Sequence, residues 1–266
     1  MTHRTHPDNI EAMPASTGVS RTIIFAVAAF TAAACGSSSG PRPVTAFAAA
    51  SLTDAFNQLK DRLPRSHPPL QLTYSFAGSQ ALVQQVIQGA PADVIATADQ
   101  KTMQKLVDRR LVRQPRVFAR NTLEIVVAPG NPKGIHGLAD LSRRDVTVVL
   151  EDPSVPAGGY SQQVLTSAHV SVKPRSLELD VRSTLAKVTS GEADAAIVYA
   201  TDVRAAGAKA QGVAIPAAQN VVASYPIAIV KASTHAKAAA EFIDEVLSAA
   251  GQRVLTGDGF LPAAGA

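Results

Sequence analysis

From Val44 onward, the hydrophobic and polar positions of this 266-residue chain alternate between strand-like and helix-like patterns. A buried run at 44–48 is followed by helical periodicity over 52–63, which stops at Pro64. Residues 70–76 then alternate with the period of two that is typical of a strand. The same order continues with a helix at 80–88, a strand at 92–97 and a helix at 100–109. This repeated order predicts an α/β fold with mainly parallel strands.

The remainder of the chain continues the pattern with longer strands. We expect strands at 121–128, 146–150, 195–199 and 221–230, and helices at 159–168, 182–190 and 236–250. Pro226 interrupts the last strand, which suits an edge or a crossing point. The strands around Val126 and Ile227 could both cross between two lobes. We therefore predict a discontinuous first lobe, 44–121 plus 222–266, and a second lobe at 122–221.

The N-terminal segment is interpreted as a targeting signal that does not belong to the fold. Arg21 precedes an uncharged run at 22–34, which is too short to span a bilayer but suits a signal-peptide core. Small residues lead into Cys35, and glycine and serine follow it. We predict a lipoprotein-type signal peptide at 1–34, a flexible linker at 35–43, and lipid attachment at Cys35. A plain secretory signal with an incidental cysteine is the alternative, and Met13 is a second candidate for the start of translation.

Composition narrows the classes of function. Hydrophobic residues make up 46% of the chain and charged residues 17%, as in packed globular proteins. The net charge of +4 is dispersed, with no Lys/Arg run of five, so we expect no nucleic-acid partner. One cysteine excludes an internal disulfide and a cysteine-rich zinc site. The absence of tryptophan argues against a carbohydrate receptor.

Catalytic motifs are missing from the sequence. The six histidines lack metalloprotease spacing, and neither a nucleophile elbow nor a Walker loop occurs. The adjacent Glu151 and Asp152 are interpreted as a solvated strand end or a helix cap. Because no nucleophile has a recognisable base, we expect no enzymatic activity. A secreted hydrolase stays the least favoured alternative.

The predicted helix starts carry more information. Ser51 and Ser79 each stand where a helix follows a strand, which is the edge at which open α/β sheets bind ligands. Free N–H groups and a partial positive charge attract anions to such a terminus, although a serine there can also be a simple cap. Ala157 and Val181 would present backbone N–H groups at two other helix starts, and Tyr199 ends a strand at the same edge.

Together these segments resemble the molybdate-binding proteins of bacterial ABC importers. The resemblance covers about 44–262, and Gly78 stands where a serine is common in that family. The matching segments follow the family's order: 47–53, 76–79, 89–94, 98–100, 152–158, 197–199 and 259–260.

The resemblance implies a two-lobed periplasmic-binding-protein fold of type II, with mainly parallel sheets and the ligand in an inter-lobe cleft. It implies that Ser51, Ser79 and Tyr199 donate hydroxyl bonds, and Ala157 and Val181 backbone N–H bonds, to molybdate or tungstate. That oxyanion is the transported ligand, with no other cofactor and no direct metal ligand. The implied partners are an importer permease with its ATPase, and the membrane through the Cys35 lipid, in an extracytoplasmic monomer.

The expected chemistry is a cage of neutral donors. Arg182 is the nearest cation, and we expect its side chain to point away from the ligand. An all-donor pocket would reject a protonated oxyanion, because its O–H would find no acceptor. A receptor for sulfate, phosphate or an organic anion stays an alternative within the binding class.

Overall fold

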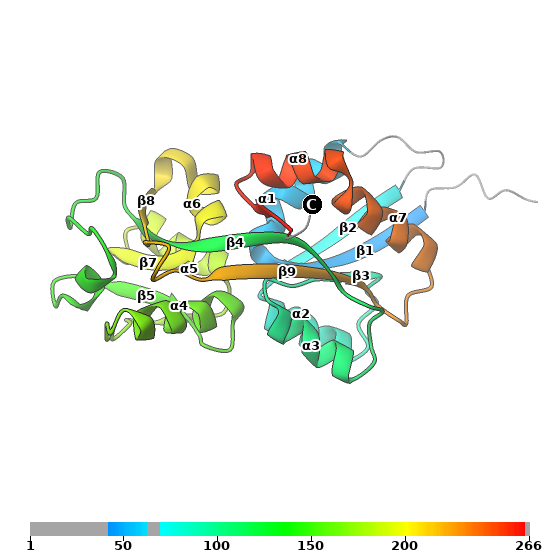
Figure 1. Ribbon diagram of the computed structural model, residues 1–266, viewed down its shortest axis with the longest axis horizontal. Helices are drawn as coiled ribbons and strands as arrows, with labels where there is room; N and C mark the ends of the chain where they lie inside the picture. Colours follow the sequence, from blue (N-terminus) through cyan, green and yellow to red (C-terminus); the bar gives the residue numbers. More distant parts are fainter. Residues whose placement is uncertain (1–41, 63–69, 264–266) are drawn as a thin grey trace, which may run out of the picture. The chain divides into compact units, whose positions relative to one another are not determined.

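The computed structural model describes residues 42–62 and 70–263, which fold into one ten-stranded mixed sheet with helices on both faces (Figure 1). Its strand order is β2-β1-β3-β9-β4-β7-β5-β6, and β8 and β10 both pair with β4. The strands are β1 (Arg42–Ala49), β2 (Leu70–Ala77), β3 (Val94–Ala96), β4 (Arg116–Val127), β5 (Val148–Glu151), β6 (Leu177–Glu178), β7 (Ala195–Tyr199), β8 (Gln211–Ala214), β9 (Val222–Ile229) and β10 (Leu261–Pro262).

The helices follow the strands in an order close to the predicted one. They are α1 (Thr53–Arg62), α2 (Ser79–Ile87), α3 (Gln100–Asp108), α4 (Pro156–Ser167), α5 (Val181–Thr189), α6 (Ala200–Ala206), α7 (Ala236–Leu247) and α8 (Ala249–Gly257), with short 3-10 turns η1 (Ala50–Leu52), η2 (Leu138–Ser142) and η3 (Gly207–Lys209). The predicted signal peptide and Cys35 lie outside the described residues. β1 begins at Arg42, so Arg42 and Pro43 of the predicted linker belong to a strand.

Two long antiparallel strands, β4 and β9, connect two groups of parallel strands. β1 pairs in parallel with β2 and β3, and β5 pairs in parallel with β6 and β7. β9 joins the first group through β3, and β4 joins the second group through β7. Figure 1 shows β4 and β9 side by side between the two groups. The α/β fold with parallel sheets is confirmed.

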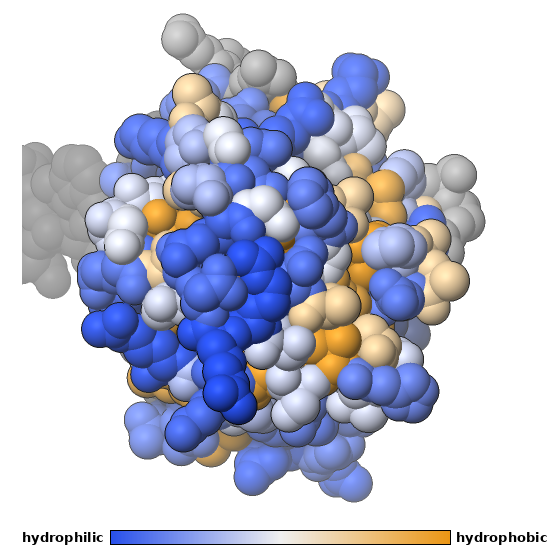
Figure 2. Space-filling model, turned by 90° about the vertical axis from the view of Figure 1, so that its left-hand side faces the viewer, coloured by the Kyte–Doolittle hydropathy of each residue, from blue (hydrophilic) through white to orange (hydrophobic). Residues whose placement is uncertain are grey.

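We call the elements around β1–β3 the first half (with α1–α3, α7 and α8) and those around β5–β8 the second half (with α4–α6). The exact lobe boundaries predicted at 121/122 and 221/222 stay a prediction. Figure 2 looks onto the end of the second half, where the surface is largely hydrophilic with small apolar patches. Within the described residues, no helix combines the length and the apolar character needed to cross a membrane.

Pro226 lies where β4 and β9 change register. The pairing shifts between Val117 and Ala119, opposite Pro226 and Tyr225. Proline has no N–H to contribute to the ladder, so a bulge at this point costs no additional hydrogen bond. The Pro226 carbonyl accepts from the Thr97 N–H at 3.0 Å, which ties the crossing strand to the end of β3. The predicted interruption at Pro226 is wrong, because β9 runs through Pro226 without a break and lies inside the sheet, between β3 and β4.

An aromatic cluster in the core leads directly to the edge where the predicted site residues lie. The Phe118 and Phe260 rings each pack edge-on against Tyr225, with centroids 6.4 and 5.4 Å away. Tyr225 in turn packs against Tyr199, with centroids 5.6 Å apart. All four side chains are buried. Edge-to-face aromatic pairs fix ring positions, so the two tyrosine hydroxyls are held at defined places.

Several element boundaries differ from the prediction. The helix predicted at 236–250 is two helices, because Ser248 adopts extended backbone and caps α8 by accepting from the Gly251 N–H. α4 begins at Pro156, three residues earlier than expected, because proline suits the first turn of a helix. The strands β6, β8 and β10 and the helix α6 were not predicted.

Candidate functional site

All five predicted binding residues line one small cavity between the two halves. Ser51 and Ser79 come from the first half, and Ala157, Val181 and Tyr199 come from the second. None of the five is more than 5% exposed. The cavity is small, with a volume of about 10 Å³, which is roughly the space for one water-sized group.

Helix N-termini converge on this cavity because α2, α4 and α5 each begin at its wall. α2 starts at Ser79 and α4 at Pro156, and neither has a side-chain cap hydrogen bond among the described residues. α5 starts at Val181 and is capped by Asp180, whose carboxylate accepts from the Ser183 N–H. The first N–H groups of a helix have no partner inside it. The cavity therefore receives backbone donors and the positive ends of three helix dipoles.

The two serine hydroxyls are positioned by neighbours and keep donor capacity. Ser79 Oγ accepts from the Ala98 N–H at 3.0 Å, which leaves its own O–H free to donate. Ser51 Oγ lies 3.1 Å from the Tyr225 hydroxyl. Asn121 Nδ2 donates to Thr201 Oγ1 at 2.8 Å and lies 3.5 Å from the Tyr225 hydroxyl. This chain of polar contacts holds Ser51 at the cavity wall.

The Tyr199 hydroxyl is buried next to the Tyr225 hydroxyl, and by distance and angle it makes no full hydrogen bond among the described residues. Burial raises the pKa of Tyr199 well above its ordinary value, and the nearby Tyr225 and Glu151 raise it further. The side chain therefore stays neutral and keeps a donor. An unpaired buried hydroxyl costs free energy, so its position at a cavity wall points to a ligand that satisfies it.

Glu151 also lines this cavity, and the interpretation of Glu151 as a solvated strand end was wrong. Its side chain is 2% exposed, because α4 and α5 both pack against β5. Neither carboxyl oxygen has a hydrogen-bond partner within the described part of the chain. Burial, followed by the charges of Asp202 and Asp180, raises the pKa of Glu151 well above its ordinary value. Asp152 differs, because it is partly exposed and its carboxylate accepts from the Ser154 N–H at 2.8 Å in the turn before α4, where it caps no helix.

The expectation of a pocket with donors alone therefore needs correction, since a carboxyl group is part of the wall. A sequence signal for it existed in retrospect. Glu151 ends a strand at the same sheet edge as Tyr199, and the β5 residues before it are all buried. The argument that placed Tyr199 in the site, its position at the end of a strand, therefore holds for Glu151 as well.

Arg182 points away from the cavity, as expected. Its guanidinium pairs with Asp54 of α1, and Nε lies 3.8 Å from Asp202 Oδ1. Nε also lies 3.4 Å from the Ala50 carbonyl oxygen. The Asp202 side chain is 1% exposed, and its burial raises its pKa to about 7 even though the Arg182 charge opposes that rise. Arg182 thus connects α5 of the second half to the first half beside the cavity.

Glycines allow the close approaches around the cavity. A Cβ at Gly78 would collide with the Leu179 carbonyl oxygen of the second half. A Cβ at Gly158 would collide with the Asp152 carbonyl oxygen, so this glycine lets α4 start directly above the end of β5. Gln80 Nε2 donates to the same Leu179 carbonyl at 2.8 Å. The two halves are therefore in contact across the cavity mouth.

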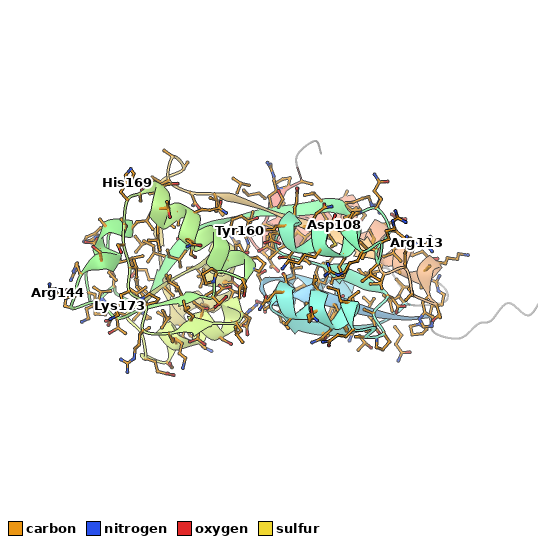
Figure 3. The ribbon with its side chains drawn as sticks, turned by 90° about the horizontal axis from the view of Figure 1, so that it is seen from below. Asp108, Arg113, Arg144, Tyr160, His169 and Lys173 are labelled. Atoms are coloured by element: carbon orange, nitrogen blue, oxygen red, sulfur yellow. The ribbon has the colours of Figure 1, made fainter. Side chains whose placement is uncertain are left out.

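Tyr160 of α4 lies where the two halves meet (Figure 3). Its hydroxyl is hydrogen-bonded to the backbone of Ser224 in β9. Burial and the nearby Asp99 charge raise the pKa of Tyr160 to about 12. This tyrosine adds a contact between α4 and the crossing strand on the side of the sheet that carries α2 and α3 in Figure 3.

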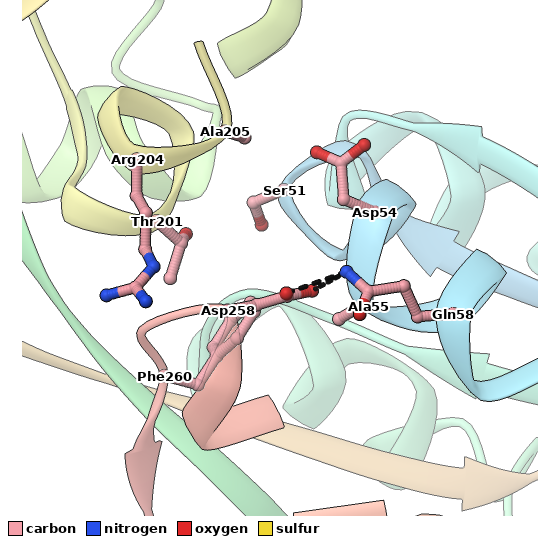
Figure 4. A pocket seen from close by; sticks show the side chains of 9 residues that line it. All are labelled: Ser51, Asp54, Ala55, Gln58, Thr201, Arg204, Ala205, Asp258 and Phe260. Atoms are coloured by element: carbon pink, nitrogen blue, oxygen red, sulfur yellow. Dashed lines mark hydrogen bonds between the residues drawn. The ribbon is translucent and has the colours of Figure 1, made fainter. Parts of the chain in front are cut away.

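A larger pocket of about 330 Å³ shares Ser51 with the cavity (Figure 4). Its wall carries two carboxylates, Asp54 and Asp258, and Gln58 Nε2 donates to both Asp258 oxygens at 2.7 and 3.0 Å. Arg204 is the cation among its lining residues. Two carboxylates disfavour an anionic ligand, so size alone does not make this pocket the binding site. The described residues contain no group of three or more acidic, histidine or cysteine side chains suited to a metal ion.

Known proteins match nearly the whole described chain. Residues 44–261 match a family model described as bacterial extracellular solute-binding protein. The chain is 38% identical over 254 residues to the molybdate-binding protein ModA of Mycobacterium tuberculosis, covering 91% of this chain and 97% of that one. It is 34% identical to ModA of Haemophilus influenzae, covering 82% and 89%. The periplasmic molybdate-binding protein of Azotobacter vinelandii has the same fold, with a TM-score of 0.71 at 19% identity over 83% and 99% of the two chains.

Proposed function

The chain belongs to the family of bacterial extracellular solute-binding proteins, and we propose that it binds molybdate, and tungstate with it, for delivery to an ABC importer. One observation carries the proposal. Two serine side chains, one tyrosine side chain and the N-termini of three helices converge on a single small cavity whose five predicted binding residues are buried. The relatives that are 38% and 34% identical to this chain are molybdate-binding proteins.

The donors suit a tetrahedral oxyanion. Hydroxyl and backbone N–H groups make short, directed hydrogen bonds to anionic oxygens, and helix dipoles add a favourable potential. Ser51, Ser79 and Tyr199 would supply hydroxyls, and Ala157 and Val181 would supply N–H groups. Because these donors serve any tetrahedral dianion, selection between molybdate and sulfate would come from the size of the closed cavity.

Solute-binding proteins of transport systems are generally non-enzymatic, and we propose that this chain has no catalytic activity. We further propose that it works outside the cytoplasm as a monomer, with a lipid on Cys35 that holds it at the membrane. The N-terminal sequence supports the lipid, since a short apolar run and small residues lead into the single cysteine. Mass spectrometry of the N-terminal peptide from a membrane fraction tests this attachment.

A thermal-shift titration of the purified full-length protein tests the function. The protein is first unfolded in guanidinium to release any oxyanion that co-purified with it. It is then refolded by removing the guanidinium, and refolding is checked by circular dichroism. A ligand that binds only the native state stabilises it by RT ln(1 + [L]/Kd), or about 2.7 kcal/mol at a hundredfold excess over Kd. We expect this rise with molybdate and tungstate.

Sulfate and phosphate serve as the comparison ligands in the same titration. A larger rise with sulfate or phosphate would reassign the ligand to another oxyanion. No rise with molybdate or tungstate, in protein that is folded and free of anion, would refute the proposed function.

A further inference from the structure

Two buried polar groups without partners line the same cavity. The Tyr199 hydroxyl is one, and the Glu151 carboxyl is the other, with both of its oxygens unpaired among the described residues. Their side chains are 1% and 2% exposed. Buried polar groups are nearly always hydrogen-bonded, so two unpaired groups on one cavity wall point to a ligand that contacts both.

The groups that surround Glu151 determine its charge. Two acidic groups act on it, Asp202 on α6 and Asp180 at the start of α5. Glu178 is its backbone partner across β5 and β6, and the Glu178 carboxylate accepts from Ser176 Oγ. The nearest cation, Arg182, has its guanidinium directed at Asp54 and Asp202. The remaining titratable neighbours are Tyr199 on β7 and Tyr160 on α4. Burial and these negative charges favour the neutral carboxylic acid, which agrees with the raised pKa of Glu151.

The protonation state of Glu151 decides whether an oxyanion can enter. An ionised carboxylate in the cavity wall would repel a dianion and would offer it no donor. A carboxylic acid is neutral and carries one O–H donor. The protonated form alone therefore matches the serine, tyrosine and backbone donors around it.

We propose that Glu151 is a further oxyanion-binding residue, which donates its carboxyl proton to the bound anion and so links anion binding to its own protonation. This inference rests on the proposed function. While Glu151 is protonated in the free protein, the affinity is independent of pH. At a pH at which free Glu151 is ionised, binding takes up a proton, and the affinity falls by up to tenfold per pH unit.

Calorimetric titration of the full-length protein with sodium molybdate, from pH 6 to pH 10, tests the linkage. Each titration is run in two buffers of different ionisation enthalpy, which measures the protons taken up per anion bound. Glu151→Gln keeps a neutral donor but cannot titrate, and Glu151→Leu removes the donor. Glu192→Gln is the matched control, because Glu192 is an exposed glutamate of the second half.

For the wild type and Glu192→Gln, we expect affinity to fall as pH rises, with proton uptake approaching one per anion. Glu151→Gln should bind within about threefold of the wild type at pH 6, with no proton uptake and no fall in affinity. Glu151→Leu should bind at least tenfold more weakly at pH 6, since the anion loses one donor. Asp202→Asn should keep a pH dependence, because it leaves Glu151 in place.

The outcomes separate the two proposals. Molybdate binding with the same pH profile and proton uptake in Glu151→Gln as in the wild type would overturn the role of Glu151 and leave the proposed function standing. Flat wild-type affinity up to pH 10 together with undiminished affinity in Glu151→Leu would do the same, as would a pH dependence lost in Asp202→Asn but kept in Glu151→Gln. A folded wild-type protein that binds neither molybdate nor tungstate at any pH would refute the proposed function itself.

Discussion

We expect the Tyr199 hydroxyl to lower the stability of the ligand-free protein and to strengthen its binding of the oxyanion. It is buried and unpaired among the described residues. Tyr199→Phe removes this unpaired group, so we expect the free energy of unfolding without ligand to rise by about 1 kcal/mol. The same change removes one donor from the oxyanion, and molybdate affinity should fall by about tenfold or more. Urea unfolding and calorimetry measure the two effects.

Tyr74 provides the matched control for this substitution. Its hydroxyl is also buried without a partner in the described ranges, but Tyr74 packs against Phe56 and Phe76, away from the cavity. Tyr74→Phe should therefore leave molybdate affinity unchanged. Equal affinity in the wild type and Tyr199→Phe would remove Tyr199 from the binding set.

Asp202 makes stability depend on pH. Its pKa is raised from 3.8 to about 7, chiefly by burial. Between these values the native state holds a proton that the unfolded state has lost, so stability falls as pH rises through this window. At 1.36 kcal/mol per unit, the loss is of the order of 4 kcal/mol by pH 7. Asp202→Asn should remove this loss. The free energy of unfolding of the variant should therefore rise relative to that of the wild type between pH 4 and pH 7.

Urea unfolding of the ligand-free protein at half-unit pH steps measures the difference. Asp244→Asn is the control, because the Asp244 side chain is 69% exposed and its pairing with Arg116 is at the surface. A constant difference between the wild type and Asp202→Asn across the whole window would show that Asp202 titrates normally.

Individual residues differ in how well the sequence predicts them. Ser51, Ser79, Ala157 and Val181 could be placed because helix starts after strands are visible in the sequence, and the sheet edge brings them together. Glu151 could not, since a glutamate at a strand end is usually solvated. Its burial depends on α4 and α5, which pack over β5 from later in the chain.

Among the helices and strands, the local sequence pattern predicted those with a clear apolar or alternating run. The others depend on contacts made in the folded chain. Strands such as β1, β2 and β7 appeared as apolar or alternating runs. α6 is a short helix of seven residues that directly follows β7, and no breaker separates the two. The division between α7 and α8 depends on the extended backbone of Ser248, in a segment whose composition favours one continuous helix.

Gly78, the N-cap of α2, makes a contact between the two halves that is sensitive to side-chain size. A Cβ there would collide with the Leu179 carbonyl oxygen, which belongs to the opposite half. Gly78→Ala should hold the two halves apart and weaken molybdate binding by about tenfold, while the stability of the free protein changes little. Gly137→Ala is the control, because Gly137 has extended backbone and open space around its Cβ position. Undiminished affinity in Gly78→Ala would mean that the halves need not approach this closely.

For the whole molecule, closure over the cavity depends on polar contacts that join the halves beside it. Gln80 donates to the Leu179 carbonyl, and Arg182 pairs with Asp54. The Ser51, Tyr225 and Asn121 contacts continue from the cavity wall to β4 and β9. The ligand would contact residues of both halves, so its binding favours the closed arrangement by as much as its affinity differs between the two states.

The ion pair between Arg182 and Asp54 should therefore contribute to affinity without touching the ligand. Both side chains are partly exposed, 32% and 47%, so solvent screening limits the pair to about 0.5 kcal/mol. Asp54→Asn should weaken molybdate binding about two- to threefold at low salt, and the difference should shrink in high salt. Small-angle X-ray scattering should show a smaller radius of gyration on adding molybdate in both proteins. Asp145→Asn, which breaks a pair within the second half, should bind like the wild type. A salt-independent loss in Asp54→Asn would assign the effect to changed packing of α1 instead of the ion pair.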